Sequence, residues 1–137
     1  MDNVKLISDV TVLAEDSVLL VKYKDGNKYD HQAGWFIPDD LVNEFEHPDD
    51  SAVRILLEQT GLKDLEPKIS FIESFKGNDR SWHLVFHYKV STGQKPEIKH
   101  SGDIAEAVWF DVKDLPEKKD IAHQGWALYT IDTILKQ

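Results

Sequence analysis

Acidic side chains gather on both sides of one arginine, Arg54, in the middle of the chain. Four carboxylates lie in the expected loop before it, namely Asp39, Asp40, Glu44 and Glu46. Glu58 and Gln59 follow it. Carboxylate and amide oxygens are ligands for hard divalent cations such as Mg2+ or Mn2+. Such a cation neutralises a diphosphate, polarises its phosphorus and lowers the pKa of an attacking water. These residue types therefore suit metal-assisted hydrolysis if enough oxygens meet on one surface.

A helix is expected directly around Arg54. Pro48 suits its first turn, and Asp49 and Asp50 there complement the helix dipole. Apolar and small residues recur at helical spacing at Val53, Leu56, Leu57 and Thr60. Gly61 then stands where a left-handed cap is wanted, and Leu62 can pack back on the last turn. On this helix Ile55, Glu58 and Gln59 are related as i, i+3 and i+4, so they share one face.

Strand patterns flank this helix on both sides. β-branched and large apolar residues predict strands at 10–14, 17–23, 69–75, 82–90 and 105–110. Turns are expected at 15–16, 25–27 and 76–80, and an irregular acidic loop from residue 39 to about 47. A last helix runs from about residue 120, with a stripe of Ile121, Leu128, Ile131 and Leu135. This order predicts a single α/β domain over residues 1–137, a sandwich in which helices cover a mixed central sheet.

Composition excludes several classes of function. The 137 residues carry a net charge of −9, which opposes binding to nucleic acid or to anionic membranes. Zero cysteines exclude disulfides, cysteine-based zinc sites and thiol nucleophiles, and fit a reducing cytoplasm. The start of the chain, MDNVKLISDV, lacks the pattern of a signal peptide, and the apolar runs are too short to span a bilayer. We therefore expect a cytoplasmic protein; exposed aromatic residues leave a homodimer open.

The segment from Gly34 to Leu62 resembles the Nudix hydrolase family. The family's box reads G-x5-E-x7-R-E-U-x-E-E-x-G-U, where U is apolar. In the register set by Arg54, the chain matches at Glu46, Arg54, Leu56, Glu58, Gly61 and Leu62 and departs at Asp40, Ile55 and Gln59. Trp35 and Pro38 stand where the family carries a Trp and a Pro. Trp109 and the turn through Leu115-Pro116 are also similar, so the resemblance covers most of the chain and implies a Nudix-type α/β/α sandwich.

The resemblance implies a role for each box residue. Nudix enzymes cleave nucleoside diphosphates linked to another group, with Mg2+ or Mn2+ held by the helix glutamates. Here Glu58 is the expected catalytic carboxylate and, with Gln59, the expected metal ligand. The face of positions 55, 58 and 59 carries a charge of −1 where three glutamates would give −3, so a cation should bind weakly. Arg54, Glu46 and Gly61 are expected to be structural, with Arg54 contacting Glu46.

Three further carboxylates could alter this picture. Asp39 and Asp40 lie where a diphosphate would pass, so they would either repel it or act as substitute ligands. In some Nudix enzymes a carboxylate before the last strand is the general base, which singles out Asp103 over Glu106. The plainer interpretation of Asp103 and Glu106 is that neither is catalytic, with Glu106 a polar strand residue. The plainer interpretation of Glu58 is a solvated partner of Arg54 contributing about 0.3–0.5 kcal/mol.

Two functions from different classes follow. In the first, the protein is a metal-dependent pyrophosphohydrolase with a degenerate box, weak or inactive by the usual route. In the second, it is a non-catalytic Nudix-fold module that binds a nucleotide-like small molecule or a protein partner. Histidines do not suggest a metal site, because His83 and His87, although on one strand face, are roughly 13 Å apart.

Overall fold

The computed structural model describes residues 3–24, 33–77 and 80–137. Its elements are β1 (Val4–Ala14), β2 (Ser17–Tyr23), β3 (Asp39–Leu41), α1 (Pro48–Thr60), β4 (Lys68–Lys76), β5 (Trp82–Thr92), β6 (Ile104–Asp111), the short 3-10 helix η1 (Lys118–Asp120) and α2 (Ala122–Leu135). The strands form one sheet in the order β4-β5-β1-β2-β6, and β3 pairs with β1.

The long strand β1 organises the sheet. It pairs in parallel with β5 from Val4 to Ala14, and its end turns back into the antiparallel strand β2. Its first half also pairs with β3, which places Asp9 opposite Asp39 and Ser8 opposite Asp40. Because β3 pairs with the middle of β1, the acidic segment at Asp39 is held against the sheet.

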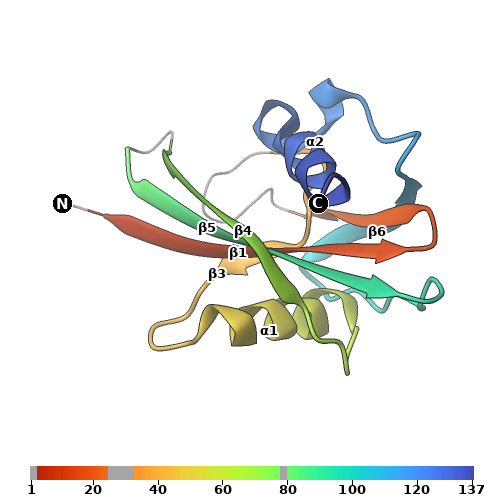
Figure 1. The fold of residues 1–137 in the computed structure, drawn as a ribbon, viewed down its shortest axis with the longest axis horizontal. Helices are drawn as coiled ribbons and strands as arrows, with labels where there is room; N and C mark the ends of the chain where they lie inside the picture. The colour runs from red at the N-terminus through yellow and green to blue at the C-terminus, as the bar shows by residue number, and fades with distance from the viewer. Residues whose placement is uncertain (1–2, 25–32, 78–79) are drawn as a thin grey trace.

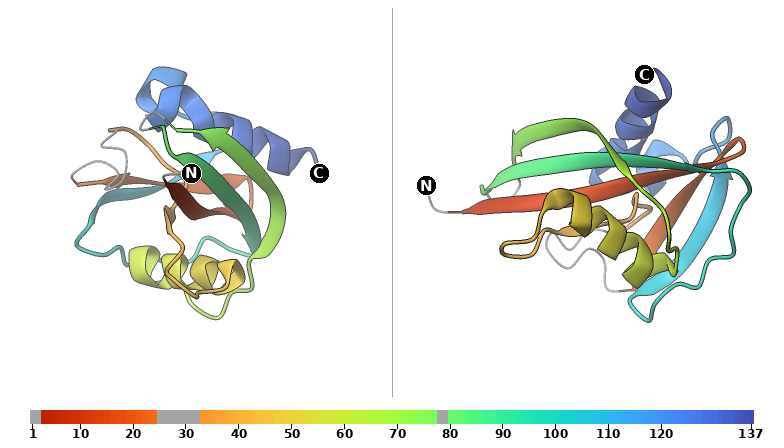
Figure 2. Two further views of the ribbon diagram at one scale, coloured as in Figure 1. Left: turned by 90° about the vertical axis from the view of Figure 1, so that its left-hand side faces the viewer. Right: turned by 60° about the horizontal axis from the view of Figure 1, so that its bottom comes forward.

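The two main helices cover opposite faces of the sheet. Figure 1 shows α1 on one side and α2 on the other, and the left view of Figure 2 shows the three layers from the end. Under α1 the buried cluster is Val10, Val12, Leu19, Ala52, Leu56, Leu62 and Tyr88. Under α2 it is Val18, Leu20, Trp35, Ile37, Ile121, Ala127 and Ile131. The predicted mixed α/β sandwich is confirmed.

Helix α1 has the ends that its sequence indicates. It begins at Pro48, and the ring of His47 caps it by accepting the Asp49 N–H over 3.0 Å. Gly61 ends it in left-handed geometry with φ 73°, and its N–H donates to the Leu57 carbonyl. Leu62 is buried in the core, as expected, whereas Val53 and Leu57 are exposed on the flank of the helix.

The five predicted strands are all present, two before α1 and three after it. The short strand β3 was not predicted. β2 has the expected limits, and β1 begins six residues earlier than predicted, at Val4, because β5 pairs with all of it. The prediction of an irregular loop from residue 39 is wrong for Asp39–Leu41, which form β3. Three residues, two of them acidic, carry no strand pattern of their own. The turn expected at 25–27 lies outside the described residues.

Helix α2 begins irregularly. Its residues His123, Gln124 and Gly125 have φ values of 56°, 57° and 88°, so the regular right-handed part starts after Gly125. Ile121 and Ile131 are buried as predicted, but Leu135 is exposed and Ile134 takes its place. The row that faces the sheet is the one through residues 127, 130, 131 and 134, which leaves Leu135 outside it. Over residues 3–24, 33–77 and 80–137, no helix has the length and apolarity to cross a membrane.

Candidate functional site

Arg54 is the centre of the polar cluster where α1 meets β3 and the loop that follows β3. Its Nε and one terminal nitrogen bind both oxygens of Glu46, at 2.8 and 3.0 Å. The same terminal nitrogen donates to the Leu41 carbonyl at 2.9 Å. The other lies 3.3 Å from Asp40 and 3.5 Å from Glu58. The expected contact between Arg54 and Glu46 is present, and the arginine also ties the loop to β3.

The paired charges keep Glu46 ionised. Hydrogen bonds from Arg54 lower the pKa of the Glu46 carboxyl, with burial opposing and the Asn43 N–H, 2.9 Å away, helping. The bond to Glu46 raises the pKa of Arg54 in turn. A carboxylate that already accepts a bidentate guanidinium and a backbone N–H has little capacity left for a cation. Both oxygens of Glu46 are therefore already engaged by groups of the protein itself.

Gln59 is held inside the protein by two hydrogen bonds. Its amide nitrogen donates to the Asp39 carbonyl at 2.8 Å. Its amide oxygen accepts from the hydroxyl of Tyr23 at 2.9 Å. The Tyr23 oxygen also accepts the Asp39 N–H at 3.0 Å and lies 3.1 Å from the Asp39 carboxylate. Burial and then the charge of Asp39 raise the pKa of Tyr23, which keeps its hydroxyl protonated.

Tyr23 belongs to the site but was not anticipated from the sequence. It is 36 residues from Gln59 and 16 from Asp39, so no local pattern links the three. Its position as the last residue of β2 puts its side chain at the edge of the sheet next to β3. A tyrosine at a strand end was the only available signal, and that signal does not specify a partner.

The two aspartates before the helix are turned into the protein. Asp39 and Asp40 are both buried. One oxygen of Asp40 accepts the Leu41 N–H at 2.8 Å, and the other faces Arg54. The Asp39 carboxylate lies beside the Tyr23 hydroxyl. The sequence pointed to Asp39 and Asp40 as groups that could contact a substrate. In the structure both carboxylates already contact groups of the protein itself.

The helix face at positions 55, 58 and 59 does not fit a hard divalent cation. Ile55 is 0% exposed and has no ligand atom. Gln59 is 9% exposed, and its only metal-binding atom, the amide oxygen, accepts from Tyr23. Only Glu58, with a side chain 57% exposed, offers a carboxylate to solvent. Among the described residues, no three or more histidine or acidic side chains converge as a metal site.

Asp103 lies apart from this cluster. It is exposed in the turn just before β6, and its backbone carbonyl accepts the Lys24 N–H at 3.0 Å. Within the described part of the chain, no hydrogen bond or ion pair joins its side chain to Glu58 or Arg54. The structure thus brings together six residues that the sequence singled out, Asp39, Asp40, Glu46, Arg54, Glu58 and Gln59, but not Asp103.

Sandwich topology, the arginine-centred loop and the glycine-capped helix together define an α/β/α sandwich domain with one polar cluster at α1. A family model described as the NUDIX domain matches residues 6–129. The chain belongs to the Nudix family.

Solved structures agree with this assignment at the level of the fold. A NUDIX hydrolase from Nitrosomonas europaea matches with a TM-score of 0.76 and 18% identity, over 96% of this chain and 88% of that one. A MutT NUDIX hydrolase from Burkholderia pseudomallei matches with a TM-score of 0.78 and 15% identity, over 97% and 99%. An Ap4A hydrolase from C. elegans matches with a TM-score of 0.70 and 14% identity, over 96% and 98%.

Proposed function

We propose that this protein is a Nudix-fold module that binds a nucleotide-like phosphoanhydride compound without cleaving it by the metal-dependent route. The observation that carries the proposal is the state of the helix face. Ile55 is fully buried and Gln59 is hydrogen-bonded on both sides of its amide, so only Glu58 remains to hold a cation. One carboxylate and waters hold Mg2+ weakly.

Charge supports the same conclusion. The Arg54 guanidinium, the one cation within this cluster in the described chain, faces Glu46, Asp40 and Glu58. With three carboxylates around it, Arg54 does not supply the unbalanced positive charge that would stabilise the charge developing during phosphoanhydride cleavage. Activation of water at the phosphorus needs a bound cation, and of the helix-face positions only Glu58 presents a carboxylate to solvent that could ligate one. The ligand class itself, a nucleotide-like compound, rests on membership of the family.

A second candidate is a slow hydrolase that uses Glu58 with a substitute carboxylate. The exposure of Glu58 favours it, because its 3.5 Å contact with Arg54 is long and an exposed pair of this kind is weak. Glu58 could therefore leave Arg54 for Mg2+ or Mn2+ at little cost. Asp40 or Asp103 would have to rearrange to supply the remaining oxygens.

Turnover and binding measurements separate the two candidates. Purified protein is incubated with ADP or Ap4A, with Mg2+, with Mn2+ and with a chelator, and binding of the same probes is followed by calorimetry. We expect binding that is independent of the metal, and no cleavage. Metal-dependent cleavage that disappears in Glu58→Gln would establish the hydrolase instead. Absence of binding under every condition would contradict the ligand class.

A further inference from the structure

A second buried cluster lies on the other face of the sheet, under α2. Asp9 of β1, His87 of β5 and Glu73 of β4 come from three adjacent strands. The two ring nitrogens of His87 contact one carboxylate each: Nδ1 lies 2.9 Å from Asp9, and Nε2 lies 2.8 Å from Glu73. The side chains of His87 and Asp9 are 0% and 2% exposed, whereas that of Glu73 is 29% exposed. Of the two contacts of His87, only the one with Glu73 therefore reaches solvent.

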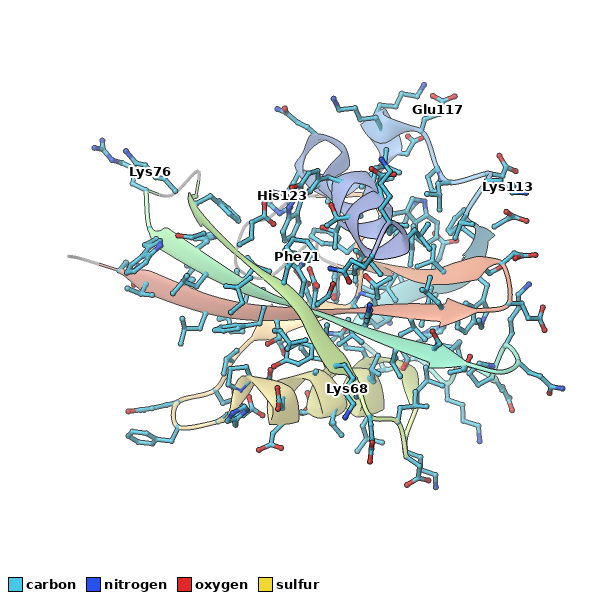
Figure 3. The ribbon with its side chains drawn as sticks, viewed as in Figure 1. Lys68, Phe71, Lys76, Lys113, Glu117 and His123 are labelled. Atoms are coloured by element: carbon cyan, nitrogen blue, oxygen red, sulfur yellow. The ribbon has the colours of Figure 1, made fainter. Side chains whose placement is uncertain are left out.

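Helix α2 is attached to this cluster through Trp126. Its indole N–H donates to the same Glu73 oxygen that contacts His87, over 3.3 Å. The Trp126 ring also meets the His87 ring at 5.5 Å. On the other side Phe71 stacks on His87 at 4.3 Å between ring centroids. Phe71 on β4 and His123 at the beginning of α2, both labelled in Figure 3, mark the two elements that the cluster connects.

The geometry sets the number of protons in the cluster. Each of the two short nitrogen–oxygen contacts needs one hydrogen, and a neutral imidazole carries only one. Two protons shared among His87, Asp9 and Glu73 give a net charge of −1, whichever group holds them. Loss of one proton leaves a ring nitrogen lone pair against a carboxylate oxygen. That contact is repulsive, so one of the two contacts of His87, with Asp9 or with Glu73, must break.

Burial of the two carboxylates determines which contact of His87 breaks. Asp9 is enclosed, and an unpaired carboxylate there would lose both water and its partner. Glu73 is partly exposed and can turn to water. When it does, Trp126 loses its acceptor, and β4, an edge strand, loses its ionic link to His87 of β5, although the hydrogen bond from Trp82 of β5 to Ser74 of β4 remains. A single proton thus controls contacts of both β4 and α2.

We propose that Asp9, His87 and Glu73 form a proton-dependent latch that holds edge strand β4 and helix α2 on the sheet and releases them in alkaline solution. The latch lies on the face opposite to α1. It is independent of the proposed function, because it requires neither a nucleotide nor a metal ion.

The direction of the pH dependence follows from the charges around His87. Burial opposes its charge, but Asp9 and Glu73 together raise the pKa of His87 to about 9. Burial raises the pKa of Asp9, against the effect of His87, and the bond to His87 lowers that of Glu73. The other titratable groups on this face include His83 of β5, in contact with Phe75, and His123 of α2, in contact with Trp126. Two lysines share the face by the period of two: Lys89 of β5, bonded to Gln137 just after α2, and Lys5 of β1, opposite His83. The stabilisation from His87 is complete below about pH 6.5 and is lost as the pH rises through about 9.

Amide hydrogen exchange tests the latch, with rates corrected for the intrinsic effect of pH. Between about pH 7 and about pH 10 we expect protection in β4 and in α2 to fall by on the order of tenfold or more, while α1 keeps its protection. Glu73→Gln should abolish this step. Its amide can donate to the unprotonated Nε2, so the contact survives loss of the proton. Glu66→Gln, next to β4 in an exposed ion pair with Lys68, is the matched control and should behave as the native protein does.

Two results would overturn the proposal. One is a protection step that persists unchanged in Glu73→Gln, or that affects α1 equally, since global unfolding would then explain it. The other comes from the native protein alone: nuclear magnetic resonance of the His87 ring should show a change centred near pH 9. A change centred near the ordinary histidine pKa of about 6.5 would mean that the two carboxylates do not hold the proton.

Discussion

Arg54 connects the loop, β3 and α1 through one side chain. Replacing Arg54 with Gln should lower the free energy of unfolding by on the order of 2–3 kcal/mol, because Glu46 and Asp40 would be left as unneutralised, largely buried carboxylates. Glu58→Gln removes a charge from the same cluster but from an exposed position, and should cost less than about 0.5 kcal/mol. Urea unfolding of both variants at neutral pH measures the difference. Equal, small effects would show that Arg54 does not organise the loop.

Phe45 is an exposed aromatic residue in strained geometry beside Glu46. Its side chain is 98% exposed and its φ is 67°, a left-handed value. Left-handed backbone costs a residue with a Cβ roughly 1–2 kcal/mol, and glycine costs about 0.4–1 kcal/mol through the unfolded chain. Phe45→Gly should therefore stabilise the protein by on the order of 0.5–1 kcal/mol in chemical denaturation. Phe45→Ala, which keeps the strain, should change little. A destabilised Phe45→Gly would show that the Phe45 side chain makes contacts worth more than the strain.

At the scale of elements, the end of α1 depends on Gly61. Its φ is 73°, and a Cβ there would lie 3.1 Å from the Cβ of Lys99 and 3.2 Å from its carbonyl oxygen. Gly61→Ala should cost about 1–2 kcal/mol in thermal or urea unfolding. Gly102→Ala is the control, because a Cβ at Gly102 meets nothing within 4 Å. Equal stability of the two variants would contradict the left-handed cap.

Elements with signals inside their own sequence were predictable, and those made by distant pairing were not. α1 carries a proline start, helical spacing and a glycine end, and β2 a run of β-branched and large apolar residues, so both have the expected limits. β3 exists only because β1 pairs with Asp39–Leu41. The left-handed residues at the start of α2 have no marker apart from Gly125. Neighbouring elements, not local preference, fix these conformations.

At the scale of the whole molecule, the sandwich brings distant residues into two polar clusters. The box spacing located the first, because Glu46, Arg54 and Glu58 lie close together in the sequence. The second joins Asp9, Glu73 and His87, of which Asp9 and His87 are 78 residues apart. Ionisable residues inside apolar strands were a signal of buried polar contacts, but only the strand order β4-β5-β1 shows which partner each one meets.

The central claim concerns the face of α1 at positions 55, 58 and 59: too little negative oxygen faces solvent there to hold a divalent cation. The most direct measurement is calorimetric titration of the native protein with Mn2+, with Glu58→Gln titrated in parallel. We predict binding weaker than about 1 mM and little difference between the two proteins. Tight, stoichiometric Mn2+ binding to the native protein that is lost in Glu58→Gln would contradict the account.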